Sequence, residues 1–168
     1  MAPVLGCIAD DFTGATDLAN MLVRGGLKTI QLLGVPRSDS HIPDVDAIVI
    51  ALKSRTIEPA TAISQSLQSL EWLQKSGTQQ FFFKYCSTFD STDKGNIGPV
   101  TEALMKALGV DFTIACPAFP ETGRTIFKGH LFVGDALLSD THMNNHPLTP
   151  MTESNLVTVL NKQTTLNV

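Results

Sequence analysis

Charged side chains follow three apolar segments of this sequence, at positions where they could bind a small ligand. The run PVLGCIA is followed at once by Asp10 and Asp11, the run AIVIAL by a KSR stretch that ends in Arg55, and the run FFF by Lys84. An arginine binds a carboxylate or a phosphate through two parallel hydrogen bonds, and a lysine adds a compact positive charge. A carboxylate accepts hydrogen bonds from hydroxyl groups. These residue types suit a ligand that is both anionic and hydroxylated.

The stretch KYCSTFDSTDKGN, residues 84–96, is the densest in polar groups. Each hydroxyl of a ligand needs both a donor and an acceptor, and a loop of hydroxyl and carboxylate side chains supplies both. The alternative is a polar loop that only caps the helix after it. Besides Lys84, the candidates for ligand binding in this stretch are Ser87, Thr88, Asp90 and Ser91.

Asp10 and Asp11 are adjacent, and neighbouring residues on an extended backbone point to opposite sides. One carboxylate could therefore face a cleft while the other bonds nearby backbone amides. Alternatively, both could serve only to cap the turn, where aspartate is common. A phosphatase of the haloacid dehalogenase type also has an acidic cluster after its first strand, but its DxDxT motif places one residue between the aspartates. The sequence leaves open whether either residue is a general base.

Familiar metal-binding and nucleotide-binding motifs are missing from the sequence. His130, His142 and His146 do not have the spacing of a metal site, and there is no HExxH. There is no Walker loop, and no GxGxxG turn follows the first apolar run. Arg124, in the proline-bounded loop PAFPETGRT, is a further candidate for contact with an anionic group.

The elements that would position these side chains alternate along the chain. Short apolar runs predict buried strands, and apolar residues spaced three and four apart predict helices. Pro59 suits a first helical turn, and Gly77 and Gly109 suit helix ends. This alternation predicts an α/β fold with a largely parallel, Rossmann-like three-layer sheet, in which ligands bind beyond the carboxyl ends of the strands. The expected strands are residues 3–9, 28–33, 46–52, 81–85 and 112–116, and the expected helices are residues 14–24, 59–75 and 97–108.

The pattern changes after Cys116. The following residues are rich in proline and glycine around two β-like pieces, TIF and HLFV, which predicts a β-hairpin near residues 124–134. A helix is expected from about residue 152 to residue 162. Residues 165–168 resemble the start of another strand, and an unfinished strand leaves its backbone unpaired. We therefore expect residues 1–168 to be a single domain and a fragment of a longer protein, the alternative being a short edge strand.

Composition and charge limit the classes of partner. The chain has 168 residues, of which 43% are hydrophobic, and its formal net charge is −4 without a long run of either sign. Binding to nucleic acid or to an anionic membrane is therefore not expected, and no segment approaches the roughly 20 apolar residues of a membrane span. The three cysteines, Cys7, Cys86 and Cys116, are expected to be reduced and to pack as small hydrophobic side chains. The expected location is the cytoplasm.

Five stretches, in order, resemble a known family. IADDFTGATD, LKSRT, FFFKYCSTFDSTDKGNIGPV, CPAFPETGRT and the segment from GHLFVGDALLSDT to SNL are similar to the N-terminal domain of the four-carbon acid sugar kinases, above all to the group acting on 3-oxo-tetronates. The resemblance implies the substrate-binding half of a bacterial two-domain kinase that phosphorylates the terminal hydroxyl of 3-oxo-tetronate, erythronate or threonate. ATP and Mg²⁺ would be bound mainly by a C-terminal domain outside this sequence, so this chain alone would be inactive.

The resemblance also implies roles for individual residues. Asp10 and Asp11 would hold substrate hydroxyls, Arg55 and Lys84 the substrate carboxylate, and Ser87 a hydroxyl, while Thr88, Asp90 and Ser91 would shape the pocket or the domain interface and Arg124 would face the transferred phosphate. The expected partners are a small sugar acid, the C-terminal domain of the same protein and, as an open alternative, a second copy of the chain. A non-catalytic module that binds a sugar acid without turnover is the alternative to a kinase.

Overall fold

The computed structural model describes residues 2–37, 39–40, 42–90 and 92–168. The chain divides into two compact units, Met1–Lys84 and Tyr85–Val168. The first unit contains a four-stranded parallel sheet, and the second contains a three-stranded antiparallel sheet. None of the helices in the described part of the chain has the length and hydrophobicity required to cross a membrane.

The first unit alternates strands and helices, and β1 lies in the middle of its sheet. The strand order is β2-β3-β1-β4, and every neighbouring pair is parallel. Because all four strands run in the same direction, their carboxyl ends meet at one edge of the sheet. The elements are β1 (Leu5–Ala9), α1 (Phe12–Arg24), β2 (Thr29–Leu33), β3 (Ala47–Ala51), α2 (Pro59–Lys75) and β4 (Gln80–Lys84).

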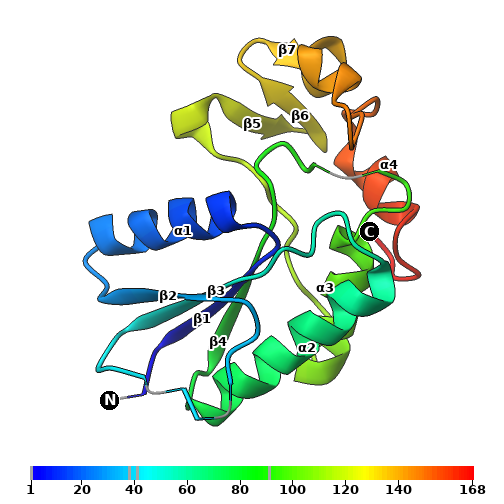
Figure 1. Ribbon diagram of the computed structural model, residues 1–168. Coiled ribbons are helices and arrows are strands. Elements are labelled where there is room, and N and C mark those ends of the chain that lie inside the picture. The colour runs from blue at the N-terminus through cyan, green and yellow to red at the C-terminus, as the bar shows by residue number, and fades with distance from the viewer. Residues whose placement is uncertain (1, 38, 41, 91) are drawn as a thin grey trace. The chain divides into compact units, whose positions relative to one another are not determined.

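The sheet of the first unit is covered on both faces, with α1 on one side and α2 on the other (Figure 1). Cys7 and Ala9 of β1 pack with Ala15 of α1 in one cluster of buried side chains. On the opposite face, a β-carbon added to Gly6 would lie 3.0 Å from the methyl groups of Leu73 in α2, so the absence of a side chain permits close packing of that helix. Helices on both faces explain why β3 is a continuous apolar run, buried at every residue.

Helix α2 spans the same residues that the sequence predicts, because proline and glycine mark its ends. Pro59 occupies the first turn, where no amide hydrogen is needed, and Gly77 follows the C-cap with a positive φ of 86°. On this helix the indole Nε1 of Trp72 donates a hydrogen bond to the backbone oxygen of Arg37, at 3.0 Å. That bond ties the loop after β2 to α2.

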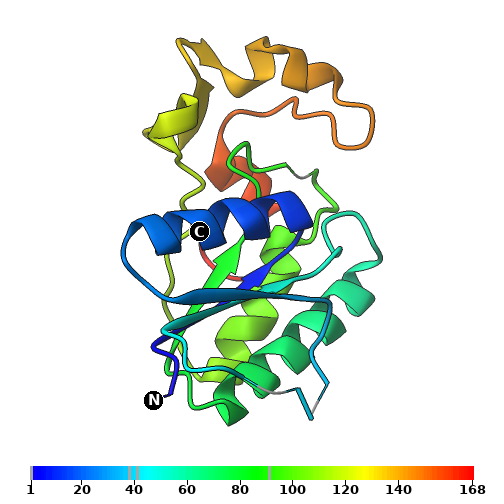
Figure 2. The same ribbon diagram turned by 60° about the vertical axis from the view of Figure 1, so that its left-hand side comes forward.

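The second unit contains one long helix, a small sheet and several short helical turns (Figure 2). Its core is formed by apolar side chains from the loop at Phe89, from the sheet at Leu131 and from Leu156 and Val159 of α4. The elements are α3 (Ile97–Leu108), η1 (Pro120–Thr122), β5 (Arg124–Phe127), β6 (His130–Val133), β7 (Ala136–Leu137), η2 (Leu138–Asp140), η3 (His142–Asn145) and α4 (Leu156–Asn161).

The β-hairpin predicted near residues 124–134 is confirmed as β5 and β6. Arg124 pairs with Val133 and Phe127 pairs with His130, so only Lys128 and Gly129 form the turn. Both turn residues have positive φ, 49° and 79°, which is the backbone of a type I′ turn and matches the twist of the flanking strands.

The predicted α/β class, with its largely parallel three-layer sheet, is confirmed, but the strand expected at residues 112–116 is wrong. No strand includes that segment in the described part of the chain, and the side chains of Phe112 and Ile114 are 75% and 77% exposed. The alternating apolar pattern gives the segment its β-propensity, but a strand also requires a hydrogen-bonded neighbour, which the pattern cannot supply.

Two further expectations for the second unit are corrected. Helix α4 begins at Leu156 rather than near residue 152, because the side chain of Asn155 caps the amides of Val157 and Thr158. Residues 165–168 do not form an edge strand, and Thr165 instead bonds the carboxylate of Glu102 through its amide and its hydroxyl, at 3.3 and 3.0 Å.

The expectation for the cysteines holds for only part of the set. Cys7 is fully buried, and burial raises the pKa of its thiol to about 12. Cys86 is half-buried, whereas Cys116 is exposed, so the prediction that all three pack in the interior is wrong for Cys116. The apolar neighbours of Cys116 belong to the same exposed segment as Phe112, which explains the error.

Candidate functional site

Backbone hydrogen bonds bring the ends of three strands together in the first unit. The Asp10 amide donates to the Lys84 oxygen at 3.0 Å, which extends the pairing of β1 with β4 by one residue. The amides of Ser54 and Arg55 both donate to the Asp10 oxygen, at 2.9 and 3.2 Å, beyond the end of β3. Asp10, Arg55 and Lys84 are therefore fixed at the carboxyl edge of the sheet, where the sequence predicted a site.

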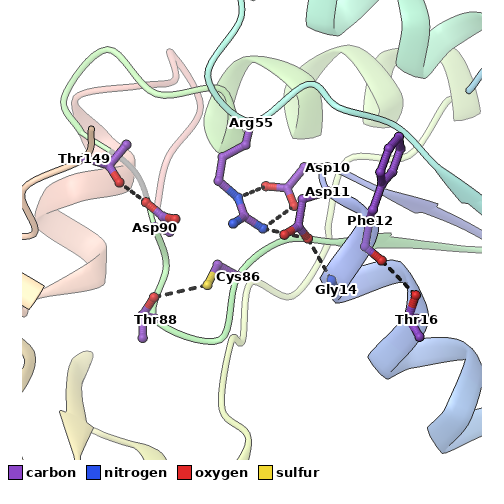
Figure 3. Close-up of polar contacts among 10 residues, drawn as sticks. All are labelled: Asp10, Asp11, Phe12, Gly14, Thr16, Arg55, Cys86, Thr88, Asp90 and Thr149. Atoms are coloured by element: carbon purple, nitrogen blue, oxygen red, sulfur yellow. Dashed lines mark hydrogen bonds and ion pairs between the residues drawn. The ribbon is translucent and has the colours of Figure 1, made fainter. Parts of the chain in front are cut away.

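The carboxylate of Asp10 is bound at both oxygens by one guanidinium group (Figure 3). Arg55 donates from Nε to Oδ2 at 3.0 Å and from Nη2 to Oδ1 at 2.8 Å, the two-point geometry in which arginine holds a carboxylate most firmly. The side chain of Asp10 is 5% exposed and that of Arg55 is 18% exposed, so this is a nearly buried ion pair. A haloacid dehalogenase nucleophile needs an accessible carboxylate oxygen, and the position of Asp10 disfavours that reading.

Asp11 has two partners at a single oxygen. It is the N-cap of α1, and its Oδ1 accepts a hydrogen bond from the Gly14 amide at 2.8 Å. The same oxygen lies 2.9 Å from Nη2 of Arg55. Neighbouring side chains were expected to point to opposite sides, so that one could face a cleft while the other bonded nearby backbone amides, as Asp11 does at Gly14. The structure instead shows both carboxylates at one guanidinium, because the long side chain of Arg55 reaches past the end of β1 to both.

Gly14 is a member of the site that sequence reasoning missed. A β-carbon at this position would lie 2.6 Å from Oδ1 of Asp11 and 3.2 Å from Nζ of Lys84. Its backbone is helical, so glycine is favoured here by the closeness of two charged groups and not by its φ angle. The signal in the sequence was a glycine three residues after an aspartate at a helix start, where the N-cap oxygen meets the backbone amide.

The charges of this cluster are close to balanced. Burial raises the pKa of the Asp10 carboxyl, and the hydrogen bond and positive charge of Arg55 act in the opposite direction, as does the charge of Lys84. Asp11 is the more accessible carboxylate, with its side chain 27% exposed. Among the described residues, its second oxygen, Oδ2, makes no hydrogen bond or ion pair. That oxygen can accept a hydrogen bond from a ligand hydroxyl, while Asp10 and Arg55 hold one another in place.

The remaining predicted residues belong to the second unit. Thr88 is buried and its hydroxyl contacts Sγ of Cys86 at 3.1 Å, whereas Ser87 is half-buried in the same turn. The Asp90 carboxylate accepts a short hydrogen bond from the Thr149 hydroxyl. Ser91 lies outside the described residues.

Thr149 connects Asp90 to an imidazole ring in the second unit. Its hydroxyl lies 2.9 Å from Nδ1 of His146, and its amide donates to the same nitrogen at 3.1 Å. Thr149 is only 8% exposed, so the chain of Asp90, Thr149 and His146 fastens the loop of residues 86–90 from inside. Sequence reasoning considered His146 only as a metal ligand and did not single out Thr149.

Arg124 begins β5 and is half-buried. Its Nη1 donates to the backbone oxygen of Thr122 at 2.5 Å. Its Nε is buried and makes no hydrogen bond to any residue that the structure describes. Arg124 is therefore placed by the tight turn before the hairpin, and no hydrogen bond or ion pair joins it to Ser87, Thr88 or Asp90 within the described chain.

A kinase would also need a nucleotide and a divalent cation, so the described residues were compared with the ligand sets that hold a metal. No group of three or more histidine, cysteine, aspartate or glutamate side chains is suitably placed across residues 2–37, 39–40, 42–90 and 92–168. The two aspartates of the first unit already share Arg55. No step of a reaction is therefore assigned to a metal held by these residues.

Parallel α/β domains that bind small molecules form a class in which the ligand lies beyond the carboxyl ends of the strands, the edge at which the carboxylates and cations of this chain lie. Within that class, the chain belongs to the family of sugar-binding N-terminal domains, whose model matches residues 5–168. It is 67% identical over 166 residues to a 3-oxo-tetronate kinase of Burkholderia multivorans. The aligned region covers 99% of this chain and 39% of that protein. The chain thus spans about two fifths of the length of the curated relatives that it matches.

Solved structures agree with the fold. A crystal structure of a Haemophilus influenzae protein is 57% identical and superimposes with a TM-score of 0.93, covering 95% of this chain and 39% of that one. A Bordetella bronchiseptica protein, described as a domain-swapped dimer with bound citrate, is 33% identical with a TM-score of 0.77 and covers 95% of this chain and 40% of that one.

Proposed function

We propose that this chain is the substrate-binding part of an ATP-dependent kinase that phosphorylates the terminal hydroxyl of a four-carbon sugar acid, 3-oxo-tetronate, erythronate or threonate. The observation that carries the proposal is the cluster of Asp10, Asp11 and Arg55 beside Lys84. The second oxygen of Asp11 can accept a hydrogen bond from a ligand hydroxyl, and the ammonium group of Lys84 attracts a ligand carboxylate. The cluster therefore suits a hydroxylated acid.

The family and the relatives support the same ligand class. The family is described as a sugar-binding N-terminal domain, and the curated relatives at 60–67% identity from several bacteria are named 3-oxo-tetronate kinase. The citrate in the Bordetella bronchiseptica structure is a small hydroxy acid, which fits a family that binds hydroxylated anions.

Within the first unit we assign different roles to the two aspartates. Asp10, bound at both oxygens, is a positioning residue that fixes Arg55. Asp11 holds a substrate hydroxyl through Oδ2 and is the better candidate of the two for a general base. Lys84 supplies the cation for the substrate carboxylate, and Arg55 adds positive charge at the same edge of the sheet.

In the second unit, the family resemblance supports Ser87 as a proposed contact for a substrate hydroxyl, and Thr88 and Asp90 as residues that shape the pocket or the domain interface. Thr88 and Asp90 are held by Cys86 and Thr149, so their contribution would be to shape the loop. Arg124 is proposed to meet the transferred phosphate. The role implied for Ser91 concerns a residue outside those that the structure describes.

The rest of the reaction is proposed for a longer protein. ATP and Mg²⁺ would be held mainly by a C-terminal domain, because this chain corresponds to only 39% of the kinases that it matches. Phosphoryl transfer depends on positioning and on neutralising charge, and closure of two domains would exclude water. A cytoplasmic location, and self-association as described for the Bordetella bronchiseptica protein, are part of the same proposal.

The proposal is tested by calorimetric titration of erythronate, threonate and 3-oxo-tetronate into the chain and its Asp11→Asn variant. A hydrogen bond to a charged group contributes about 1.5–3 kcal/mol, so Asp11→Asn should weaken binding by roughly 10- to 100-fold. Asp17→Asn, an exposed change later in α1, is the matched control and should leave binding unchanged. Absence of saturable binding by all three acids, or equal affinity of Asp11→Asn and the parent chain, would contradict the proposal.

Binding alone does not separate a kinase from a module that binds without turnover. The protein that carries this chain together with a C-terminal domain should transfer phosphate from ATP to the acid that binds best, measured by release of ADP. Binding without ADP release in that protein would favour the non-catalytic module.

A further inference from the structure

The second unit contains a span of chain whose backbone lacks partners, called here the open segment and defined as residues 110–116. It runs between the end of α3 and η1, outside every helix and strand of the described chain (Figure 1). The amides and carbonyl oxygens of residues 111–115 make no hydrogen bond to any residue that the structure describes. A row of unpaired backbone groups is a template on which a further strand can pair.

The open segment is fixed at both ends. The Val110 amide donates to the Met105 oxygen at 3.1 Å, a bond that closes the C-terminal turn of α3. At the other end, the backbone of Cys116 is hydrogen-bonded to the phenol of Tyr85. A segment that is held at both ends has already lost part of its conformational freedom, so pairing with it costs less entropy than pairing with a loose chain.

The side chains of the open segment are exposed although most of them are apolar. Val110, Phe112 and Ile114 are 46%, 75% and 77% exposed. Alternate residues of an extended chain point to the same side, so these three can form one apolar stripe against a partner. Strand edges that remain in water usually carry charged residues or proline, and Asp111 is the only charged residue of the open segment. Its composition is therefore that of a strand with a covered edge.

The area of this stripe distinguishes between two occupants. A side chain of this kind buries roughly 100–200 Å², so the three together supply at most roughly 400 Å². A stable complex of two separate molecules buries about 800 Å² on each partner, which makes the stripe too small to hold a second copy of the chain. A strand of the same polypeptide needs less area, because a covalent connection gives it an effective concentration in the millimolar range.

A longer protein would supply such a strand near the open segment. The chain matches a family of N-terminal domains and corresponds to 39% of a curated relative, so the remainder would follow residue 168. The hydroxyls of Thr164 and Thr165 bind the Glu102 carboxylate in α3, at 2.7 and 3.0 Å. From Glu102 to Val110 the helix rises about 12 Å, which about four extended residues span. Residues beyond 168 would therefore be within reach of the open segment.

We propose that the open segment is the docking strand for the part of the longer protein that follows residue 168. A strand of that part pairs with the backbone of residues 111–115, and its apolar side chains cover Val110, Phe112 and Ile114. The inference rests on the two-domain protein of the proposed function and adds the surface through which the two parts are joined. It does not depend on which acid is phosphorylated.

Hydrogen exchange of the amides of residues 111–115, followed by mass spectrometry, tests the inference without ATP or sugar acid. In the 168-residue chain these amides should exchange at rates close to those of an unstructured peptide, because they have no hydrogen bonds. Pairing along one edge of a strand bonds alternate amides. In the longer protein about two of the five should therefore exchange about 100-fold more slowly.

A double variant, Phe112→Ser with Ile114→Ser, removes the stripe and keeps the backbone. In the longer protein it should reduce the protection of residues 111–115 to about twofold or less. Phe127→Ser is the matched control, because Phe127 is 65% exposed on β5, outside the open segment, and it should keep the full protection. Unchanged exchange of β3, which is buried at every residue, verifies that each variant is folded.

Three results would overturn the inference. The first is equal exchange of residues 111–115 in the longer protein and in the 168-residue chain, and the second is full protection in the double variant. The third is protection in the 168-residue chain that increases with its concentration, because a second copy would then be the occupant. The proposed function fails separately, since a longer protein that protects the open segment but releases no ADP with any tetronate would contradict the kinase and support the docking strand.

Discussion

The two units of this chain treat their polar groups in different ways. In the first unit, Asp10 and Asp11 share the guanidinium of Arg55 as an ion-pair partner at the end of a buried parallel sheet. In the second unit, the buried polar chain is built around the neutral hydroxyl of Thr149. When two carboxylates share one cation, removal of that cation leaves both without an ion-pair partner. Removal of a single hydroxyl should cost less unfolding free energy. The buried polar contacts of the first unit are thus between charged groups, whereas those of the second unit run through a hydroxyl and hold the loop of residues 86–90.

The largest effect is expected from removal of the shared cation. Arg55→Ala leaves two carboxylates without their partner, one of them nearly buried, and should lower the free energy of unfolding by about 3 kcal/mol. Arg37→Ala is the control, because its pair with Asp39 is 84% and 71% exposed, and it should leave stability unchanged. Urea unfolding followed by circular dichroism measures both. Equal stability of the two variants would contradict the idea that Arg55 stabilises the first unit by pairing with Asp10 and Asp11.

Two glycines, Gly14 in the first unit and Gly98 in the second, allow a further comparison of the units. Each lies in the first turn of a helix, close to atoms of another residue. A β-carbon at Gly98, in the second unit, would lie 2.5 Å from Cβ of Gln163 and 2.9 Å from its backbone carbon. Backbone cannot move aside easily, so Gly98→Ala should cost about 2 kcal/mol of unfolding free energy. Gly14→Ala meets a side-chain oxygen, so it should cost less than about 1 kcal/mol of stability while weakening tetronate binding through Asp11. Thermal unfolding and calorimetry distinguish these results, and the reverse order would contradict the assignment.

A smaller effect is expected from Thr149→Val, which keeps the shape of the side chain and removes its hydroxyl. The lost hydrogen bond to Asp90 should lower the unfolding free energy of the second unit by about 1 kcal/mol, while the bond from the Thr149 amide to Nδ1 of His146 is kept. Thr158→Val is the matched control on α4, since the Thr158 hydroxyl makes no hydrogen bond among the described residues. A loss as large as that of Arg55→Ala would show that the two units do not differ in the proposed way.

The smallest effect is a shift in titration. Burial raises the pKa of Tyr85 to about 12 from its ordinary value of 10.0. The phenol of the unfolded chain therefore ionises first, and the contribution of Tyr85 to stability is present at neutral pH and is lost as pH rises from about 10 to about 12. Tyr85 is the only tyrosine in the sequence, so phenolate absorbance reports it alone. A native midpoint near 10 would mean that the ring is not buried.

Much of the fold could be predicted because the sequence marks the ends of its elements. Helices α2 and α3 span the predicted residues, with proline in the first turn of each and Gly77 and Gly109 beyond their ends. The strand expected at residues 112–116 was wrong because a β-strand depends on a neighbour that lies elsewhere in the chain. The start of α4 was missed because its N-cap, Asn155, was not recognised as the stronger local signal.

The grouping of Asp10, Arg55 and Lys84 could be predicted from the sequence, but the pairing of their atoms could not. Parallel strands bring their carboxyl ends together, so the proximity of Asp10 and Arg55 followed from the order of the elements. Which oxygen meets which nitrogen depends on side-chain angles that no sequence pattern specifies. For that reason only the structure shows three features of the cluster. Arg55 binds both oxygens of Asp10, one oxygen of Asp11 contacts both Arg55 and the Gly14 amide, and Gly14 lies close to two charged groups.

The hydrogen bond from Trp72 to Arg37 has a practical consequence. Trp72 is the only tryptophan in the sequence, it is 8% exposed, and it belongs to the first unit, whereas the only tyrosine belongs to the second. The chain therefore carries one intrinsic optical label in each unit. Indole fluorescence and phenol absorbance, recorded during a single denaturation, reveal whether the two units melt as one cooperative block or in succession, without a dye or an added mutation.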